Sequence, residues 1–519
     1  MTRALGHSAD AYESKFELTI VMLCAMSGTL MQALDSTIAN VALPHMQGDL
    51  QASRDQITWV LTSYIVAAAI MTAPVGWLAS RFGRKNLAIV TLGGFTIASM
   101  MCGAAQTLDQ MIAFRLLQGM FGAALSPISQ TIMLDLYPPQ KRGQMMAIWG
   151  MGVMVGPVLG PTLGGWLTDE YNWRWVFYVN LPFGIAAVTG IALFLRDTHR
   201  DSTLRFDWMG FGVLAMGLGA LQLMFDRGTD KDWFSSSEIV LEAVLAGLGL
   251  YLFTVHILTV KRPFIPREMF ADRNFVSGLA LMFMIGIVML ASSALLPPFL
   301  QQLGGHTVTE TGWLMAPRGI GTMFSMMFAG RLALKLDPRY VMATGMALIL
   351  WSMWQMAGWT PAIDDTSIVT TTIMQGIGMG LVFVPMNLVS FATLPPQFRT
   401  DGSAVINLVR NVGSALGVSV TTTYLTESTQ TIHAQLASHV NMFNRALTVN
   451  APSLMWNPML PFGAAQIDQV VSYNAAVQAY ANDFMFMLVV CAPALLVLFL
   501  MRRPPVVPPT QKVEMEVME

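Results

Sequence analysis

The stretch IWGMGVMVGPVLGPTLGG, residues 148–165, decides how this chain folds. It is apolar and about as long as a bilayer core is thick, yet glycine recurs every four residues. On a helix this spacing puts the glycines on one face, where missing side chains let another helix approach closely. Two prolines each remove a backbone donor, so we expect a bend that faces protein rather than lipid. The residues concerned are Gly152, Gly156, Pro157, Gly160, Pro161, Gly164 and Gly165.

The composition indicates that most of the chain lies in a membrane. Of its 519 residues, 54% are hydrophobic and 12% are charged, and the mean hydropathy is +0.54, outside the range of soluble proteins. The net charge of -2 gives no sign of a nucleic-acid partner. The three cysteines lie in apolar segments without the spacing of a disulfide or a metal site. We therefore expect membrane lipid around the protein, no metal and no cofactor.

Fourteen apolar segments are each long enough to cross a bilayer. Their ranges are 18–43, 57–79, 87–105, 109–134, 144–167, 174–196, 208–225, 238–260, 274–302, 310–333, 340–358, 366–392, 401–424 and 483–501. Of the 29 Lys and Arg residues, 21 fall on the side of both termini and five on the other side. Because basic residues gather on the cytoplasmic side, this bias predicts that both termini are cytoplasmic.

Two parts of the chain repeat each other. PPQKR at residues 138–142 matches PPQFR at residues 395–399, and Gln118 matches Gln375 at the same offset of 257. Parallel repeats of this kind place a substrate site between two halves, which rock to open it alternately to either side.

The repeat predicts an all-α membrane protein with two pseudo-symmetric six-helix bundles and an extra helix pair between them. The predicted parts are a cytoplasmic segment 1–17, a bundle 18–196, the extra pair 208–260, a bundle 274–501 and a cytoplasmic tail 502–519.

The motifs resemble those of the major facilitator superfamily, and within it the fourteen-helix drug:proton antiporters of the EmrB/QacA type. GWLASRFGRK, residues 76–85, is similar to the superfamily loop motif after helix 2, with Ser80 where an acid is usual. The glycine-proline run resembles the motif of the antiporter members, and LDSTIANVALP, residues 34–44, resembles the first-helix signature. Residues 173–182 and 226–236 are most similar to the EmrB branch.

This resemblance implies the major facilitator fold and proton-driven export of hydrophobic compounds across a bacterial inner membrane. It also implies a periplasmic adaptor protein and an outer-membrane channel as partners. On the cytoplasmic side it implies a gate, in which an arginine matching Arg84 pairs with an acid matching Asp135. An ordinary interfacial charge pair is the alternative. The predicted gate residues are Gly76, Arg81, Gly83, Arg84 and Asp135.

Asp35 is the one acid that the predicted segments place deep in the membrane. An ionised carboxylate there costs about 2.5–3.5 kcal/mol, so such an acid is a functional candidate. Counting residues from the outer helix ends puts Arg115 at the same depth. We expect the pair to couple transport to protons through reversible protonation of the carboxylate. The alternative is a static ion pair that only orders the bundle.

Other polar residues within the spans are candidates for the substrate cavity. Arg318 and Arg410 are suited to attracting an anionic substrate or to acting as packed structural cations. Five uncharged residues are suited to donating hydrogen bonds into the cavity or to joining helices. These five are Gln32, Asn40, Gln118, Asn387 and Asn407.

The stretch 425–482 is longer than any other outer connection. We expect it to be a periplasmic docking surface for the adaptor, with a flexible insertion as the alternative. The function expected overall is a proton-coupled antiporter that exports hydrophobic drugs or toxic small molecules. The alternatives are an exporter dedicated to one endogenous metabolite, an uptake symporter and a membrane receptor. No catalytic triad, phosphate loop or metal cluster in the sequence indicates an enzyme.

Overall fold

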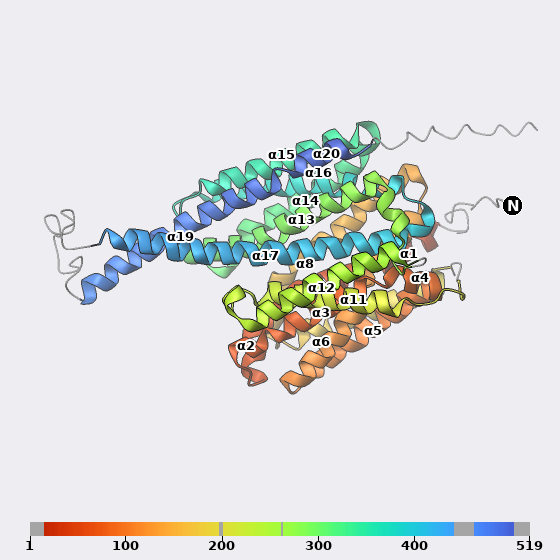
Figure 1. The fold of residues 1–519 in the computed structure, drawn as a ribbon, viewed down its shortest axis with the longest axis horizontal. Helices are drawn as coiled ribbons and strands as arrows, with labels where there is room; N and C mark the ends of the chain where they lie inside the picture. Colours follow the sequence, from red (N-terminus) through yellow and green to blue (C-terminus); the bar gives the residue numbers. More distant parts are fainter. Residues whose placement is uncertain (1–14, 197–200, 261–262, 441–460, 503–519) are drawn as a thin grey trace, which may run out of the picture.

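The computed structural model describes residues 15–196, 201–260, 263–440 and 461–502, and helices make up almost all of them (Figure 1). The first bundle contains α1 (Lys15–Asp49), α2 (Arg54–Ile57), α3 (Trp59–Thr72), α4 (Val75–Phe82), α5 (Arg84–Ala104), α6 (Leu108–Gly122), α7 (Leu125–Leu136), α8 (Pro139–Glu170), α9 (Trp175–Tyr178) and α10 (Asn180–Phe194).

The extra pair follows, and then the second bundle. The pair is α11 (Trp208–Arg227) and α12 (Ser237–Thr259), with the short η2 (Trp233–Ser235) between them. The second bundle contains η3 (Arg267–Ala271), α13 (Arg273–Pro298), the π-helix η4 (Phe299–Leu303), α14 (Val308–Lys335), α15 (Pro338–Ala357), α16 (Asp365–Ala392), η5 (Pro396–Phe398), α17 (Arg399–Ser438), α19 (Pro461–Cys491) and α20 (Ala494–Leu500).

The fourteen predicted spans each correspond to a described helix or helix pair. Ten helical segments are long and apolar enough to cross a membrane, and α3 with α4, bent by 57°, makes an eleventh. The long helices α8, α14 and α15 correspond to the other three. We name the ends of the bundle by the predicted orientation, so that the inner end is the one where α1 begins and α20 ends.

The prediction that 425–482 is a connection outside the spans is only partly right. Helix α17 continues to Ser438 and α19 begins at Pro461, while residues 441–460 lie outside the described residues. At 1.5 Å per residue, α17 is roughly 60 Å long, about twice the thickness of the hydrocarbon core. Both helices extend past the rest of the molecule at its outer end (Figure 1). We call their projecting parts, residues 425–438 and 461–478, the outer hairpin.

Contacts between its two helices explain why the outer hairpin stays helical beyond the apolar segments. Ile432 of α17 packs with Ala475 and Ala479 of α19. His433 Nε2 lies 3.0 Å from Asp468 Oδ1. A search for apolar spans could not detect this pairing, because it depends on two helices meeting side by side.

The glycine face of α8 packs against α1. A Cβ atom on Gly156 would lie 2.3 Å from the backbone of Ala33, and one on Gly160 would lie 2.0 Å from Thr37 Oγ1. A Cβ on Gly164 would lie 2.7 Å from Ile38 Cγ1. Gly152 and Gly165 are less crowded, since added Cβ atoms there would meet only Met26 at 3.3 Å and Val41 at 3.9 Å. The structure thus shows the close helix approach that the glycine spacing predicts.

The two bundles contact each other toward the inner end. The backbones of Gly143 in α8 and Gly330 in α14 meet there, so that a Cβ on Gly330 would lie 2.4 Å from the carbonyl oxygen of Gly143. Nearby, the rings of Trp149 and Phe383 stack at 5.9 Å. These contacts hold α8 against α14 and α16 at one end, while the outer half of α8 follows α1.

Gln130 and Asn387 identify the symmetry axis of the molecule. The Gln130 amide donates to Asn387 Oδ1 at 2.7 Å, and the two residues are 257 positions apart. This is the offset of the sequence repeat, so each residue contacts its own counterpart in the other bundle. A pseudo-two-fold axis therefore runs between them.

Candidate functional site

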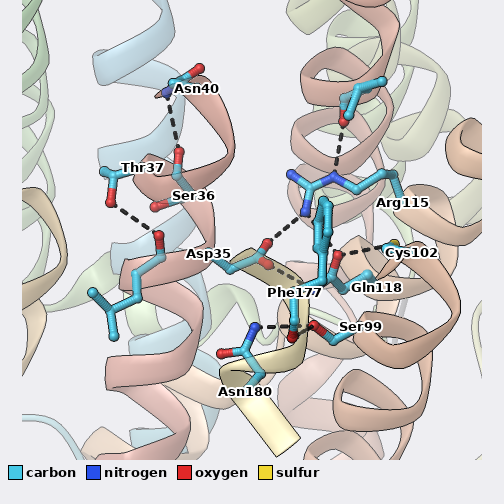
Figure 2. Close-up of polar contacts among 12 residues, drawn as sticks. Asp35, Ser36, Thr37, Asn40, Ser99, Cys102, Arg115, Gln118, Phe177 and Asn180 are labelled. Atoms are coloured by element: carbon cyan, nitrogen blue, oxygen red, sulfur yellow. Dashed lines mark hydrogen bonds and ion pairs between the residues drawn. The ribbon is translucent and has the colours of Figure 1, made fainter. Parts of the chain in front are cut away.

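Asp35 forms a buried network with two residues of α6 (Figure 2). Arg115 Nη1 donates to Asp35 Oδ2 at 2.7 Å, and Gln118 Nε2 donates to Asp35 Oδ1 at 2.7 Å. Arg115 Nη1 also donates to Gln118 Oε1 at 2.8 Å. All three residues have no exposed surface. The structure brings together the pair that the sequence predicts at one depth, and adds Gln118 to it.

Arg115 is held by further contacts that fix its guanidinium group. Its Nε donates to the carbonyl oxygen of Val60 at 2.9 Å, and its Cζ lies 4.3 Å from the centre of the Tyr64 ring. The Phe177 ring is 5.6 Å away on another side. A cation over an aromatic face is stabilised by the ring quadrupole. These contacts hold Arg115 in place independently of Asp35. Asp35 can therefore lose its charge while Arg115 keeps its position.

The network is arranged for an ionised carboxylate. Both oxygens of Asp35 accept hydrogen bonds, one of them from a cation, and this offsets the cost of removing the charge from water. Protonation of Asp35 would remove the charge that Arg115 faces. The same site can thus exist in two states that differ in one proton and in the strength of the contact between α1 and α6.

The second bundle has a counterpart of this site that lacks its charges. Gln375 Nε2 donates to Ser292 Oγ at 3.3 Å, and the two residues are 83 positions apart, the same separation as Gln118 and Asp35. Serine therefore stands where the first bundle has its acid. The pseudo-symmetry of the fold does not extend to the buried ion pair.

A charged cluster joins the bundles at the inner end. Arg84 contacts Asp135 Oδ2, as the resemblance implied, and Arg399 Nη1 donates to Asp135 Oδ1 at 2.7 Å. Arg84 begins α5 and Arg399 begins α17, so Asp135 joins the start of α5 to the opposite bundle. Burial and the neighbouring Arg399 lower the pKa of Arg142 to about 10, and its Nε donates to the carbonyl oxygen of Leu134. We call Arg84, Asp135 and Arg399 the inner latch.

The other predicted gate residues lie around this latch. A Cβ on Gly76 would lie 1.8 Å from Asp401 Oδ1 and 2.7 Å from Asp401 Cα, so α4 touches α17 there. The opposite bundle thus supplies an acid beside the loop motif. Gly83 has φ = 84°, a backbone conformation that favours glycine, and it precedes α5. Arg81 Nη1 is buried without a hydrogen-bond partner in the described part of the chain, so the structure does not include it in the latch.

Two of the predicted cavity residues lie where the bundles touch. Asn387 accepts from Gln130, and Asn407 accepts from Ser126 Oγ at 3.1 Å. Both asparagines are almost completely buried. In this conformation they form a polar layer that closes the inner side, and a cavity role for them would require the bundles to separate there.

The remaining candidates are more varied. Arg318 Nη1 and Nη2 lie 3.3 Å from Ser293 Oγ and the carbonyl oxygen of Met289, both in α13. Arg410 Nη1 has no hydrogen-bond partner in the described ranges. Asn40 is exposed and donates to the carbonyl oxygen of Ser36 in its own helix, and Gln32 has a buried Oε1 without a described partner.

Sequence reasoning missed two residues that the structure singles out. Arg399 was visible in the repeated PPQFR motif, but its contact with Asp135 depends on how the bundles meet. The last predicted span, 483–501, begins at Asp483, whereas the structure places Asp483 well inside α19 with no exposed surface. The structure thus adds a second fully buried acid to Asp35, in the other bundle.

Comparisons with known proteins agree with this architecture. The sequence model of the Major Facilitator Superfamily matches residues 25–418, which is most of the chain. The chain belongs to this superfamily. It is 37% identical over 432 residues to the multidrug export protein EmrB of Escherichia coli (strain K12), with 82% of this chain and 84% of that protein covered. It is 34% identical over 439 residues to the fatty acid resistance protein FarB of Neisseria gonorrhoeae, covering 84% and 86% of the two chains.

A solved structure has the same fold. The human organic anion transporter MFSD10 superimposes with a TM-score of 0.61 at 14% identity, covering 93% of this chain and 99% of that chain. This likeness concerns the fold alone. Together with the family match, it identifies the protein as a multi-pass membrane transporter related to multidrug exporters, rather than an enzyme.

The inner latch gives a testable prediction about cycling. Replacing Arg84 with alanine should slow transport several-fold, because Asp135 then loses one of the cations that it contacts. If the three residues act as one unit, Asp135→Ala should add little to Arg84→Ala or to Arg399→Ala. Transport rates of the singles and doubles in reconstituted vesicles measure this coupling. Arg273→Ala, an exposed arginine at the inner end, is the control, and fully additive losses would contradict the latch.

Proposed function

We propose that this transporter is a proton-coupled antiporter that exports hydrophobic small molecules by alternating access. The observation that supports this best is the buried network of Asp35, Arg115 and Gln118. A fold that needed only stability would be as well served by apolar residues, since a buried ion pair is weak support for stability. A carboxylate that can take up and release a proton gives the pair a function.

The proposed cycle links this proton to the contacts between the bundles. When Asp35 takes up a proton from the outside, its attraction to Arg115 weakens, and α1 is free to shift against α6. Helix α8 packs tightly on α1 through its glycines, so this shift reaches the contact of α8 with α14. The inner latch and the polar layer of Asn387 and Asn407 then separate, and the cavity opens to the cytoplasm.

The substrate is proposed to bind between the bundles, close to the two arginines of the second bundle. Arg318 and Arg410 lie on α14 and α17, the helices that face the first bundle through α8 and α4. Neither arginine has an acid partner among the residues described. Uncompensated cations in a membrane protein favour a substrate with a negative group, such as an amphiphilic carboxylate.

A sensitivity screen tests the substrate class. Deleting the gene should make cells sensitive to hydrophobic compounds, and the most affected group should be anions such as long-chain fatty acids. Sensitivity to many unrelated drugs favours a multidrug exporter. Accumulation of one cellular metabolite, without drug sensitivity, would instead favour a dedicated exporter.

The outer hairpin is proposed to dock a periplasmic adaptor that passes substrate to an outer-membrane channel. It projects from the outer end of the molecule, beyond the other helices (Figure 1). Its exposed face carries an open hollow, lined by the polar and small side chains of Gln430, Thr431, Ala434, Gln435 and Ser438. A stable projection of two paired helices offers a helical adaptor a surface that no transport step needs.

Replacing residues 434–471 with a short Gly/Ser linker should separate docking from transport. The cut keeps Ile432 and Ala475, so the hairpin base remains packed. We expect normal membrane insertion and normal transport in reconstituted vesicles, but at least a several-fold loss of resistance in cells. A second variant carries alanine at Gln430 and Gln435 only. It should weaken docking while the hairpin stays intact, which separates loss of the docking surface from loss of the hairpin. Adaptor co-purification with the shortened protein at the wild-type yield would contradict the proposal.

A further inference from the structure

Asp483 is a buried carboxyl group that the proposed cycle does not use. It has no exposed surface, and neither of its oxygens has a hydrogen-bond partner among the described residues. We propose that Asp483 is a second proton-binding group, which takes up a proton from the outside when the outer end of the second bundle opens and holds that proton in this conformation. This inference rests on the proposed proton-driven export and adds a second protonation site to it.

The surroundings of Asp483 suit a neutral carboxyl and not a charged one. Its neighbours Tyr480 and Phe484 belong to an aromatic cluster with Phe299 and Trp359. The Phe299 ring lies 5.4 Å from the Tyr480 ring and 6.4 Å from the Phe484 ring. An ionised carboxylate buried there without a partner would cost several kcal/mol, and such a group takes up a proton instead.

Charged groups on the packed helices do not compensate this carboxyl. Helices α13 and α15 carry arginines only in their first turns at the inner end, and neither η4 nor α20 carries a charged residue. On α17, the Tyr424 ring stacks on Phe486 at 4.9 Å, which puts Glu427 level with Asp483, but Glu427 is exposed. Arg410 lies about 25 Å further along α17. The Tyr480 hydroxyl, one helical turn away on α19, is a titratable group that interacts with it.

The position of Asp483 suits a proton that arrives from the outside. It is seventeen residues from Leu500 at the inner end of α20, which corresponds to about 25 Å. Because the hydrocarbon core is about 30 Å thick, Asp483 lies near its outer boundary. A proton would reach it after a short path once the aromatic cluster opened.

The helix that packs on the aromatic cluster beside Asp483 has a built-in irregularity. Pro297 and Pro298 end α13, and η4 follows as a π-helix, a rare form that is frequent at functional sites. The Tyr473 hydroxyl donates to the carbonyl oxygen of Leu303 at 3.1 Å, which ties η4 to α19. Movement of η4 away from α19 would break this bond and expose the aromatic cluster together with Asp483.

The contrast with Asp35 supports two separate proton sites. In the same conformation, Asp35 accepts hydrogen bonds from Arg115 and Gln118, as an ionised carboxylate does. Asp483 accepts none from the described residues. The second bundle has Ser292 at the position that matches Asp35. The buried acid of the second bundle therefore lies at a different position, on α19.

Infrared spectroscopy of the purified protein in lipid tests this inference. The carbonyl stretch of a protonated carboxyl should be visible at neutral pH, disappear in Asp483→Asn and persist in Asp35→Asn. In heavy water the band should shift within minutes, as the carboxyl exchanges its proton during opening. A band unaffected by Asp483→Asn, or one that never exchanges, would overturn the proposal.

Folding and the first proton site need separate controls. Asp483→Leu replaces a neutral buried group with an apolar one of similar size, so it should elute as a single species and lack the band. Dicyclohexylcarbodiimide, which modifies protonated carboxyls in apolar surroundings, should label Asp483 in the wild type and in Asp35→Asn. Absence of this label counts against Asp483. Normal proton-driven export by Asp35→Asn would overturn the proposed function, and it would leave band and label unchanged.

Discussion

Replacing Asp35 with asparagine should abolish proton-driven export and leave substrate exchange between the two sides of a vesicle measurable. Asparagine keeps the shape of the side chain but cannot take up and release a proton. The rate driven by a pH gradient should fall to that of vesicles without protein. Substrate exchange without a pH gradient continues, because it needs only that the substrate-bound protein opens alternately to the two sides of the membrane.

The matched control for this variant lies on the same helix. Asp49 ends α1, and its side chain is 55% exposed beside Arg174 and Trp173. Asp49→Asn makes the same chemical change outside the buried network, and it should transport at nearly the wild-type rate. Loss of a buried pair's partner costs about 3–5 kcal/mol. A stability measurement on both variants therefore accompanies the assay, and normal gradient-driven transport by Asp35→Asn would show that the pair is only structural.

Enlarging the glycines of α8 should have the second large effect. In Gly160→Leu the new side chain would begin 2.0 Å from Thr37 Oγ1, and in Gly156→Leu it would meet the backbone of Ala33 at 2.3 Å. Overpacking typically costs about 1–3 kcal/mol, and contact with the backbone leaves less room to adjust. We expect transport in vesicles to fall at least tenfold for either variant.

Gly165 is the control for this series, because it lies on the same helix with space around it. A Cβ there meets only Val41, at 3.9 Å, which is an ordinary contact. Gly165→Ala should therefore retain transport, whereas Gly160→Ala should already lose most of it. Equal activities of the two alanine variants would remove the contact between α8 and α1 from the mechanism.

The sequence was sufficient for features that depend on position along one helix. The spacing of glycines predicted a face that another helix approaches, and residue counting predicted that Asp35 and Arg115 share a depth. It did not identify α1 as the partner of that face. Which helix lies next to α8 depends on the packing of the whole bundle.

Features that depend on contacts between helices or bundles were not predictable in this way. The apolar segment 483–501 begins at Asp483, so counting hydropathy placed this acid at a boundary. Only the pairing of α17 with α19 shows that the helix continues outward and covers it. In the same way, Arg399 meets Asp135 of α7 and Asp401 meets Gly76 of α4 because the bundles close at the inner end.

The central claim, that protons and substrate move in opposite directions through this protein, is tested most directly in reconstituted vesicles. Purified protein is inserted, a pH gradient is imposed, and the movement of a compound identified by the deletion screen is followed together with internal pH. The account predicts that substrate moves toward the acidic side while protons leave it, and that Asp35→Asn stops both. Movement of substrate and protons in the same direction, or substrate flux that is unaffected by the gradient, would contradict it.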